Sequence, residues 1–271
     1  MTLIFKAYEI IGKMIGCIVQ ARMGSTRLPG KVLMLLDKKY TVLDYVINQL
    51  KHSKLLGKII IATTNLEEDD MIVDFAKKNE IQCFRGSSVD VLDRFYHCSK
   101  KFSLRHIMRI TGDDPLIDPT VIDKAIKEYI NSNVDYLTNS IQRTFPYGTE
   151  VEIFSFDSLE LVWKFANKKS EREHVTPYFY NHPTKFKIHH FIQENNQSRF
   201  RYTIDRKEDY LVVLEIISRI KKRPIQTVDI VKLFTEEPKL AEINSNVISN
   251  EGYIKSINAD KNLGQRNEKE N

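Results

Sequence analysis

The sequence predicts an α/β protein with a doubly wound, mostly parallel, Rossmann-like sheet that is covered by helices on both faces. Two observations lead to this fold class. Apolar runs of strand length alternate with segments whose apolar residues recur at helical spacing. Short loops that contain glycine or aspartate follow several of these runs, at the strand ends where open α/β sheets bind ligands. With 271 residues, of which 42% are hydrophobic, the chain can bury the core that such a sheet needs.

Strands and helices alternate through the first half of the chain. The expected strands, each a short apolar run, are residues 15–20, 58–64, 81–84, 105–111 and 135–139. The expected helices are residues 41–50, 67–78, 90–101 and 119–130. In the first helix Leu43, Val46 and Leu50 share one face, and Pro119 opens the last helix, where proline is tolerated. This alternation is typical of parallel sheets.

The alternation becomes less regular after Thr144. We expect strands at residues 150–154, 185–193 and 200–204, and helices at 157–167, 171–180, 208–220 and 228–234. Residues 14–260 are expected to form one domain. Residues 1–13, whose apolar stretch is interrupted by charges, are expected to be a dispensable N-terminal extension, and the polar residues 261–271 a disordered tail.

The composition restricts the class of partner. Lys and Arg total 41 against 36 acids, a net charge of +5, which suits a polyanionic small molecule and is too weak to indicate nucleic acid. No apolar run is long enough to span a membrane, so no membrane partner is expected. The three cysteines (Cys17, Cys83 and Cys98) include no CxxC pair, which favours a reducing, cytoplasmic location.

The most distinctive segment is QARMGSTRLPGK, residues 20–31, directly after the first strand. It combines the cations Arg22, Arg27 and Lys31 with hydroxyl side chains and two glycines. Exposed backbone N–H groups and fixed cations together bind phosphate oxygens. The segment is not a Walker A loop, because Val32 stands where that motif needs serine or threonine.

Two aspartates follow later strands. Asp113 in TGDDP ends the fourth strand, and it is a candidate Mg²⁺ ligand because magnesium takes few carboxylates and completes its shell with phosphate and water oxygens. Asp205 in FRYTIDRKED is the candidate second ligand. Asp114 is interpreted as a turn residue before proline, and Asp209 as a capping residue in the first turn of a helix.

Together these motifs resemble the cytidylyltransferases that activate acidic sugars, most closely the spore-coat polysaccharide biosynthesis protein F family. The resemblance spans residues 14 to about 260 and includes QARMGSTRLPGKVL, FRGSSVDVLDRF, RITGDDPLIDP, the YG-E-VE element and REHVTPY. It implies a glycosyltransferase-A-like nucleotidyltransferase fold with a small β-containing insertion for the acceptor. The implied enzyme transfers a nucleoside monophosphate from CTP to a sugar or sugar acid and releases pyrophosphate, for surface polysaccharide or glycan biosynthesis. A sugar-phosphate guanylyltransferase, a metal-dependent glycosyltransferase of the same fold and a non-catalytic nucleotide-binding module are the alternatives.

The resemblance also implies roles for individual residues. The catalytic residues would be Arg22, Lys31, Asp113 and Asp205, of which the two aspartates would hold Mg²⁺. The nucleotide-binding residues would be Ala21, Arg22, Gly24, Ser25, Arg27, Lys31, Gly86, Ser87 and Arg94. The acceptor-binding residues would be Glu150, Glu152, Arg172, Glu173 and His174.

The acceptor and the oligomeric state are less closely specified. The triplet Arg172-Glu173-His174 is absent in this form from the sialic-acid and ketodeoxyoctonate enzymes, so the acceptor's identity stays open. Arg172, His174 and the net positive charge favour an anionic sugar or sugar phosphate. Residues 174–191 are dense in aromatics and histidines, as interfaces often are, so a homodimer is expected; a substrate lid, which would have a similar composition, is the alternative.

Overall fold

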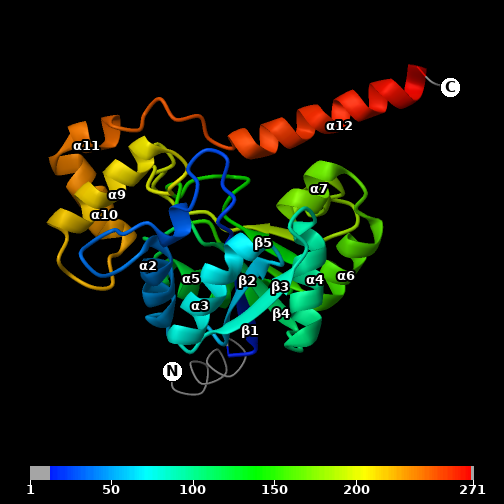
Figure 1. Cartoon of the computed structure of the whole chain (residues 1–271), viewed down its shortest axis with the longest axis horizontal. Helices are drawn as coiled ribbons and strands as arrows, with labels where there is room; N and C mark the ends of the chain where they lie inside the picture. The colour runs from blue at the N-terminus through cyan, green and yellow to red at the C-terminus, as the bar shows by residue number, and fades with distance from the viewer. Residues whose placement is uncertain (1–12, 270–271) are drawn as a thin grey trace.

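A single seven-stranded sheet forms the centre of the computed structural model, which describes residues 13–269 and, as regards side chains, residues 13–262 (Figure 1). The strand order is β3-β2-β1-β4-β6-β5-β7. The strands are β1 (Ile15–Gln20), β2 (Ile59–Thr64), β3 (Gln82–Gly86), β4 (His106–Thr111), β5 (Tyr136–Thr138), β6 (Glu152–Ser155) and β7 (Ile188–His190). All neighbours are parallel except β6, which runs antiparallel to both β4 and β5. The doubly wound, mostly parallel fold is therefore confirmed.

The strands of the second half do not form a sheet of their own. Both β6 and β7 join the sheet of the first half, β6 between β4 and β5 and β7 at the edge beside β5. The β-containing insertion expected for the acceptor is thus an extension of the main sheet, and its side chains share the edge at which β1 and β4 end.

The register of β1 and β4 determines where the loops that follow them lie. Gln20 is opposite Thr111, so both strands end at the same level of the sheet. The backbone N–H of Gly112 donates to the carbonyl of Gln20 at 2.8 Å. A Cβ at Gly112 would approach that carbonyl oxygen and the Cβ of Ala21 to 3.0 Å, so this close approach favours glycine. The two loops are thereby held side by side.

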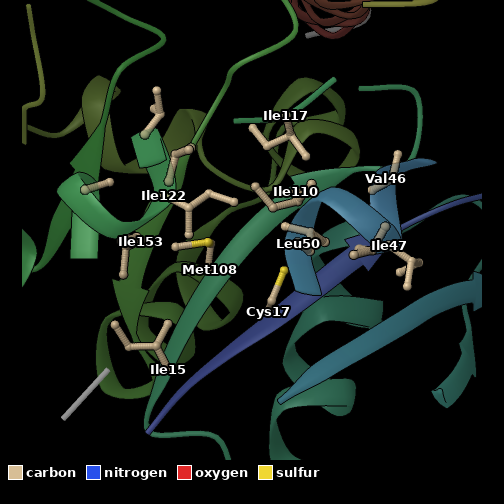
Figure 2. Close-up of a cluster of buried hydrophobic side chains, with 14 of the residues drawn as sticks. Ile15, Cys17, Val46, Ile47, Leu50, Met108, Ile110, Ile117, Ile122 and Ile153 are labelled. Atoms are coloured by element: carbon tan, nitrogen blue, oxygen red, sulfur yellow. The ribbon is translucent and has the colours of Figure 1, made fainter. Parts of the chain in front are cut away.

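Helices cover both faces of the sheet, which explains why the strands are continuous apolar runs. On one face lie α2 (Val42–Lys51), α3 (Asp70–Lys78) and α5 (Pro119–Ser132), whose side chains pack on those of β1 and β4, including Cys17 and Met108 (Figure 2). On the other face lie α4 (Val91–Lys101), α6 (Phe156–Phe165) and α8 (Pro177–Asn181). Tyr178, Phe179 and Phe186 are buried in this second core, so the aromatic density of residues 174–191 has an explanation within the chain.

A third core supports the loop after β1 from the side of the C-terminal half. It is formed by α9 (Lys207–Arg219), α10 (Thr227–Glu236) and α11 (Pro238–Glu242), packed on the segment around the 3-10 helix η1 (Lys31–Leu33) and on α2. The buried Gln49 amide ties α2 to this layer, because it donates to the carbonyl of Ile225 at 2.6 Å and accepts from the Ile225 N–H at 3.0 Å.

Residues 200–204 are extended but are not a strand of the sheet, which differs from the expectation. Their backbone forms one isolated bridge, between Arg201 and Tyr147, and a hydrogen bond from the Ile204 N–H to the carbonyl of Asp113 at 2.9 Å. Side chains nevertheless alternate as in a strand. Phe200, Tyr202 and Ile204 are buried in the third core, whereas Arg201 and Thr203 face the opposite side.

Two helical segments also differ from expectation. The helix expected over 171–180 is divided into α7 (Lys169–His174) and α8, because Pro177 has no N–H and Val175 has a positive φ of 72°. The C-terminal helix α12 (Glu251–Lys269) occupies residues 261–269, where a disordered tail is expected, and its Asp260 carboxylate accepts from the Ser170 N–H of α7 at 3.3 Å. The extension expected at residues 1–13 lies outside the described residues except for Lys13. Across residues 13–269, the helices are all too short or too polar to cross a membrane.

Candidate active site

A cavity of about 780 Å³ opens at the edge of the sheet where β1 and β4 end. Its wall carries nine lysine and arginine side chains, namely Arg22, Arg27, Lys31, Arg94, Arg109, Arg143, Lys169, Arg201 and Lys255. It also carries six carboxylates, namely Asp113, Asp114, Glu150, Glu152, Glu173 and Asp205. Because cations outnumber acids, the cavity attracts an anionic ligand.

The first half of the cavity is the part lined by the loop after β1 together with Asp113 and Asp205, and Lys31 lies at its centre. It follows Gly30, whose φ of 69° turns the chain into η1, and its side chain is buried. The Lys31 Nζ donates to Asp113 Oδ2 at 2.5 Å, to the carbonyl of Ile204 at 2.6 Å and to Asp205 Oδ1 at 2.9 Å. Burial lowers the pKa of Lys31, but the charges of Asp113 and Asp205 outweigh it, so the pKa is raised and the ammonium stays charged.

Asp113 and Asp205 are about ninety positions apart in the sequence, yet their carboxylates converge. Since both contact the same ammonium, the two oxygens lie no farther apart than the sum of their distances to it, 2.5 and 2.9 Å. Asp205 also accepts from the guanidinium of Arg27 and, at 2.9 Å, from Arg201 Nη2. Burial raises the pKa of Asp205, but Lys31 and Arg27 lower it more strongly, to about 2. The structure therefore brings together the two aspartates that the sequence singled out.

Asp209 and Asp69 hold backbone segments around this cluster. The carboxylate of Asp209, predicted to be a capping residue, accepts from the Asp205 N–H at 3.0 Å and the Arg206 N–H at 2.9 Å at the start of α9. The fully buried Asp69, at the end of the 3-10 helix η2 (Glu67–Asp69), accepts from the Met23 N–H at 2.7 Å. Asp69 thereby fixes the loop after β1 to the end of β2.

Arg22 differs from the other cations of this loop. Its side chain is exposed and pairs with no carboxylate within residues 13–262, whose side chains are described. Arg94 is buried nearby, and both burial and the charge of Arg22 lower the pKa of Arg94, to about 10. The buried Nε of Arg94 has no hydrogen-bond partner in the described structure. These two cations are available to an anionic ligand.

Asp114 is buried beside the cluster, in accord with its interpretation as a turn residue. Its carboxyl accepts from the Thr111 hydroxyl, and its backbone N–H donates to the Thr111 carbonyl at 3.3 Å. Burial, together with the charges of Glu150 and Asp113, raises the pKa of Asp114 well above its ordinary value.

The second half of the cavity is the part lined by Glu150, Glu152, Glu173 and His174. Its first two carboxylates come from β6 and the segment before it. The nearly buried Glu152 accepts from the guanidinium of Arg109 and from the hydroxyl of Tyr136. Glu150 pairs with Arg143 at 2.6 Å and accepts from the Gly148 N–H at 2.7 Å. Both glutamates are held by these contacts and lie in the cavity wall, as expected.

Glu173 and His174 line the same cavity from α7 and share Ser256 of α12 as a partner. The Ser256 hydroxyl donates to Glu173 Oε2 at 2.8 Å, and its oxygen lies 3.1 Å from His174 Nε2. Burial lowers the pKa of His174 to about 4, and the opposing charge of Glu173 does not offset this effect. His174 is therefore neutral at pH 7, and its Nε2–H can donate to Ser256.

Four of the expected residues lie outside the cavity wall. Arg172, expected to bind the acceptor, lies outside the wall: its guanidinium donates to Asp90 at 2.5 Å and to the carbonyl of Trp163 at 2.8 Å, and so joins α7 to α4 and α6. Gly86 and Ser87 contact Arg94: its Nη1 donates to the Ser87 carbonyl at 3.0 Å, and a Cβ at Gly86 would approach the Arg94 side chain to 3.0 Å. Gly24 faces Glu68.

Several residues of the cavity wall were not among the expected site residues. Arg109 lies two positions before Thr111 in β4, and both line the cavity. Arg201, Thr203 and Asp205 are two positions apart along the extended segment, so their side chains face the same side and all three line the cavity. Side chains two positions apart in an extended segment face the same side, so the positions of Thr111 and Asp205 were a signal for Arg109, Thr203 and Arg201. No comparable signal marks Tyr253, Lys255 and Ser256 of α12.

Comparison with known proteins supports the resemblance stated above. The family model described as cytidylyltransferase matches residues 16–245. An uncharacterised protein of Methanocaldococcus jannaschii is 40% identical over 237 residues, which cover 87% of this chain and 96% of that protein. The spore coat polysaccharide biosynthesis protein SpsF of Bacillus subtilis is 33% identical, over 83% of this chain and 95% of SpsF. A cytidylyltransferase structure from Leptospira borgpetersenii superimposes with a TM-score of 0.81 at 35% identity, covering 84% of this chain and 96% of that chain.

Proposed function

Because the chain belongs to the cytidylyltransferase family, we propose that it transfers the cytidine monophosphate group of CTP to an anionic sugar, either a sugar acid or a sugar phosphate. The observation that carries the proposal is the convergence of Lys31, Asp113 and Asp205 at one end of the cavity, beside the exposed Arg22, which pairs with no carboxylate among the described side chains. Family membership favours this reaction over the guanylyltransferase and glycosyltransferase alternatives.

The cations of the first half are placed to bind a triphosphate. Arg22, Arg27 and Lys31 all come from the loop that follows β1, and all line the cavity. Arg22 contributes a positive charge without first giving up a carboxylate partner among the described residues. Arg27 and Lys31 exchange contacts with Asp205 and Asp113 for contacts with phosphate oxygens. Fixed cations of this kind stabilise the charge that develops on a leaving pyrophosphate.

The carboxylates of Asp113 and Asp205 fit a Mg²⁺ ion. Their oxygens converge on one point, now approached by the Lys31 ammonium, and magnesium uses one or two protein carboxylates with phosphate and water oxygens. No group of three or more His, Cys, Asp and Glu side chains in residues 13–262 offers a cage made by protein alone. When bound there, Mg²⁺ would neutralise and polarise phosphate oxygens.

The chemistry requires positioning more than covalent participation by the protein. An oxygen of the acceptor, a hydroxyl of a sugar acid or a phosphate oxygen of a sugar phosphate, attacks the α-phosphorus. The bond from that phosphorus to the bridging oxygen breaks, and pyrophosphate leaves with the electron pair; a hydroxyl nucleophile also releases its proton. The second half of the cavity, with Glu150, Glu152, Glu173 and His174, would orient the acceptor. These groups offer hydrogen-bond acceptors to sugar hydroxyls, and Arg109 and Lys169 offer positive charge to the acceptor's anionic group.

The test is pyrophosphate release with CTP, GTP, ATP and UTP, each with Mg²⁺ and a panel of 3-deoxy-manno-octulosonate, N-acetylneuraminate and hexose phosphates. We expect release that depends on both CTP and an anionic sugar. The Arg22→Ala protein should bind CTP at least about tenfold more weakly, because it loses a charge-assisted contact. It should unfold at the same urea concentration as the wild type, since Arg22 pairs with no carboxylate within residues 13–262. Faster release with GTP than with CTP, or unchanged CTP affinity in Arg22→Ala, would overturn the proposal.

A further inference from the structure

We propose that α12 forms the specificity-determining wall of the acceptor half of the cavity, with Ser256 as its central positioning residue and an anionic, polyhydroxylated sugar as the ligand. The inference rests on the proposed function and adds to it, because α12 lies outside the region matched by the family model, residues 16–245. The chemistry of nucleotidyl transfer would then reside in the matched region, and the choice of acceptor partly in this helix.

The helix is fixed at two points along its first half. Near its start, the carboxylate of Glu251 pairs with Arg206 at 2.7 Å and with Arg27 of the loop after β1 at 3.7 Å. Two turns later, Asp260 accepts from the Ser170 N–H at 3.3 Å. Figure 1 shows α12 passing α7, against which it lies, and then continuing beyond it. The segment between the attachments is therefore held across the cavity.

Side chains of that segment complete the acceptor half. Tyr253, Lys255 and Ser256 all belong to the cavity wall. Ser256 is nearly buried and contacts both Glu173 and His174, at 2.8 and 3.1 Å, as described above. The Tyr253 ring lies edge-on to the His174 ring at 5.2 Å between centroids. Without α12, Glu173 and His174 would lose the partners that orient them.

The chemistry of this wall indicates the class of ligand. Glu173 is an acceptor for sugar hydroxyls, and Tyr253 and neutral His174 can each donate or accept a hydrogen bond. Lys169 lies in the same wall, is exposed and pairs with no carboxylate within the described part of the chain. Hydroxyl-directed hydrogen bonds combined with an available ammonium suit a sugar that carries a carboxylate or phosphate. A neutral sugar would leave this ammonium without a partner.

The decisive variant is Ser256→Ala, which removes one hydroxyl that holds two acceptor-facing side chains. We expect kcat/KM for the acceptor that the wild type uses best to fall about 10- to 100-fold, the range for losing hydrogen bonds to a charged group. The Kd for CTP, measured by calorimetry with Mg²⁺, should stay unchanged, because Ser256 contacts no residue of the triphosphate half. Ser256→Thr, which keeps a hydroxyl, should restore most of the loss.

The matched control is Asn258→Ala, which removes a polar side chain from the same helix on its exposed side, outside the cavity wall. It should leave both acceptor kinetics and CTP affinity at wild-type values. Equal acceptor kcat/KM in Ser256→Ala and Asn258→Ala, or a Ser256→Ala protein with weakened CTP binding and unchanged acceptor KM, would overturn the inference. A wild-type protein that does not bind CTP would overturn the proposed function instead, so the two failures are distinguishable.

Discussion

Replacing Asp205 by asparagine keeps the size of the side chain and removes the charge that Lys31, Arg27 and Arg201 stabilise. These cations lower the pKa of Asp205 from its ordinary 3.8 to about 2. Because one pKa unit is worth about 1.36 kcal/mol, the charged carboxylate stabilises the folded protein by about 2 kcal/mol at pH 7. The side chain is only 17% exposed, so solvent screening reduces this value little. Asp205→Asn should therefore lose about 2 kcal/mol of unfolding free energy at pH 7.

The sign of the pH dependence follows from the direction of the pKa shift. A carboxyl group whose pKa is lowered on folding contributes its full stability above its unfolded pKa and loses it as the pH falls through the folded value. The difference between wild type and Asp205→Asn should therefore shrink to roughly half at pH 3, since only part of the carboxylate's contribution is left there.

Urea unfolding at pH 7 and pH 3 measures both quantities. Asp74→Asn is the control, because Asp74 is an exposed carboxylate of α3, and its replacement should change the free energy of unfolding by less than about 0.5 kcal/mol. Pyrophosphate release by Asp205→Asn should fall roughly 100- to 1,000-fold, the usual effect of losing one charge-stabilising contact in the transition state. Equal destabilisation at pH 3 and pH 7, or near-normal turnover, would refute the reasoning.

Two further predictions concern groups that hold the two halves of the site. The pKa of His174 is lowered to about 4, so below its ordinary value of 6.5 the unfolded chain takes up a proton that the folded chain does not. Between pH 7 and pH 5 the wild type should lose more unfolding free energy than His174→Gln in urea titrations, and parallel losses would contradict this assignment. Asp69→Asn removes the charge that fixes the Met23 N–H, so the Kd for CTP should rise about tenfold while acceptor KM stays unchanged. Calorimetric titration checks this, and equal effects on both substrates would indicate a general structural role instead.

The parts of the molecule that could be predicted from sequence are those determined by local periodicity. The alternation of strands and helices up to residue 139 depends on side chains a few positions apart, and the strand ends then place Lys31 and Asp113 at one edge of the sheet. Asp205 was identified because it ends an apolar alternating run, even though that run, residues 200–204, is not a strand of the sheet.

The residues that could not be predicted depend on how distant segments pack. Whether Arg172 faces the cavity or α4 is decided by where Asp90 lies, and the two are far apart in sequence. The polar composition of residues 261–269 indicates disorder when considered alone, and the attachment of α12 through Asp260 to Ser170 is a tertiary contact that composition does not report. The residues of the triphosphate half could thus be predicted from local sequence patterns, whereas the contribution of α12 to the cavity wall became visible only in the structure.

The bridge that Lys31 makes between Asp113 and Asp205 has a consequence for the catalytic cycle. The Lys31 ammonium lies between the carboxylates of Asp113 and Asp205 and serves as an internal counter-ion for both. A ligand that binds there therefore exchanges one set of ion pairs, those of Lys31 with Asp113 and Asp205, for another. We expect the loop that follows β1 to regain its contacts with Asp205 and Asp113 after the product leaves, so that these carboxylates have positive partners between turnovers.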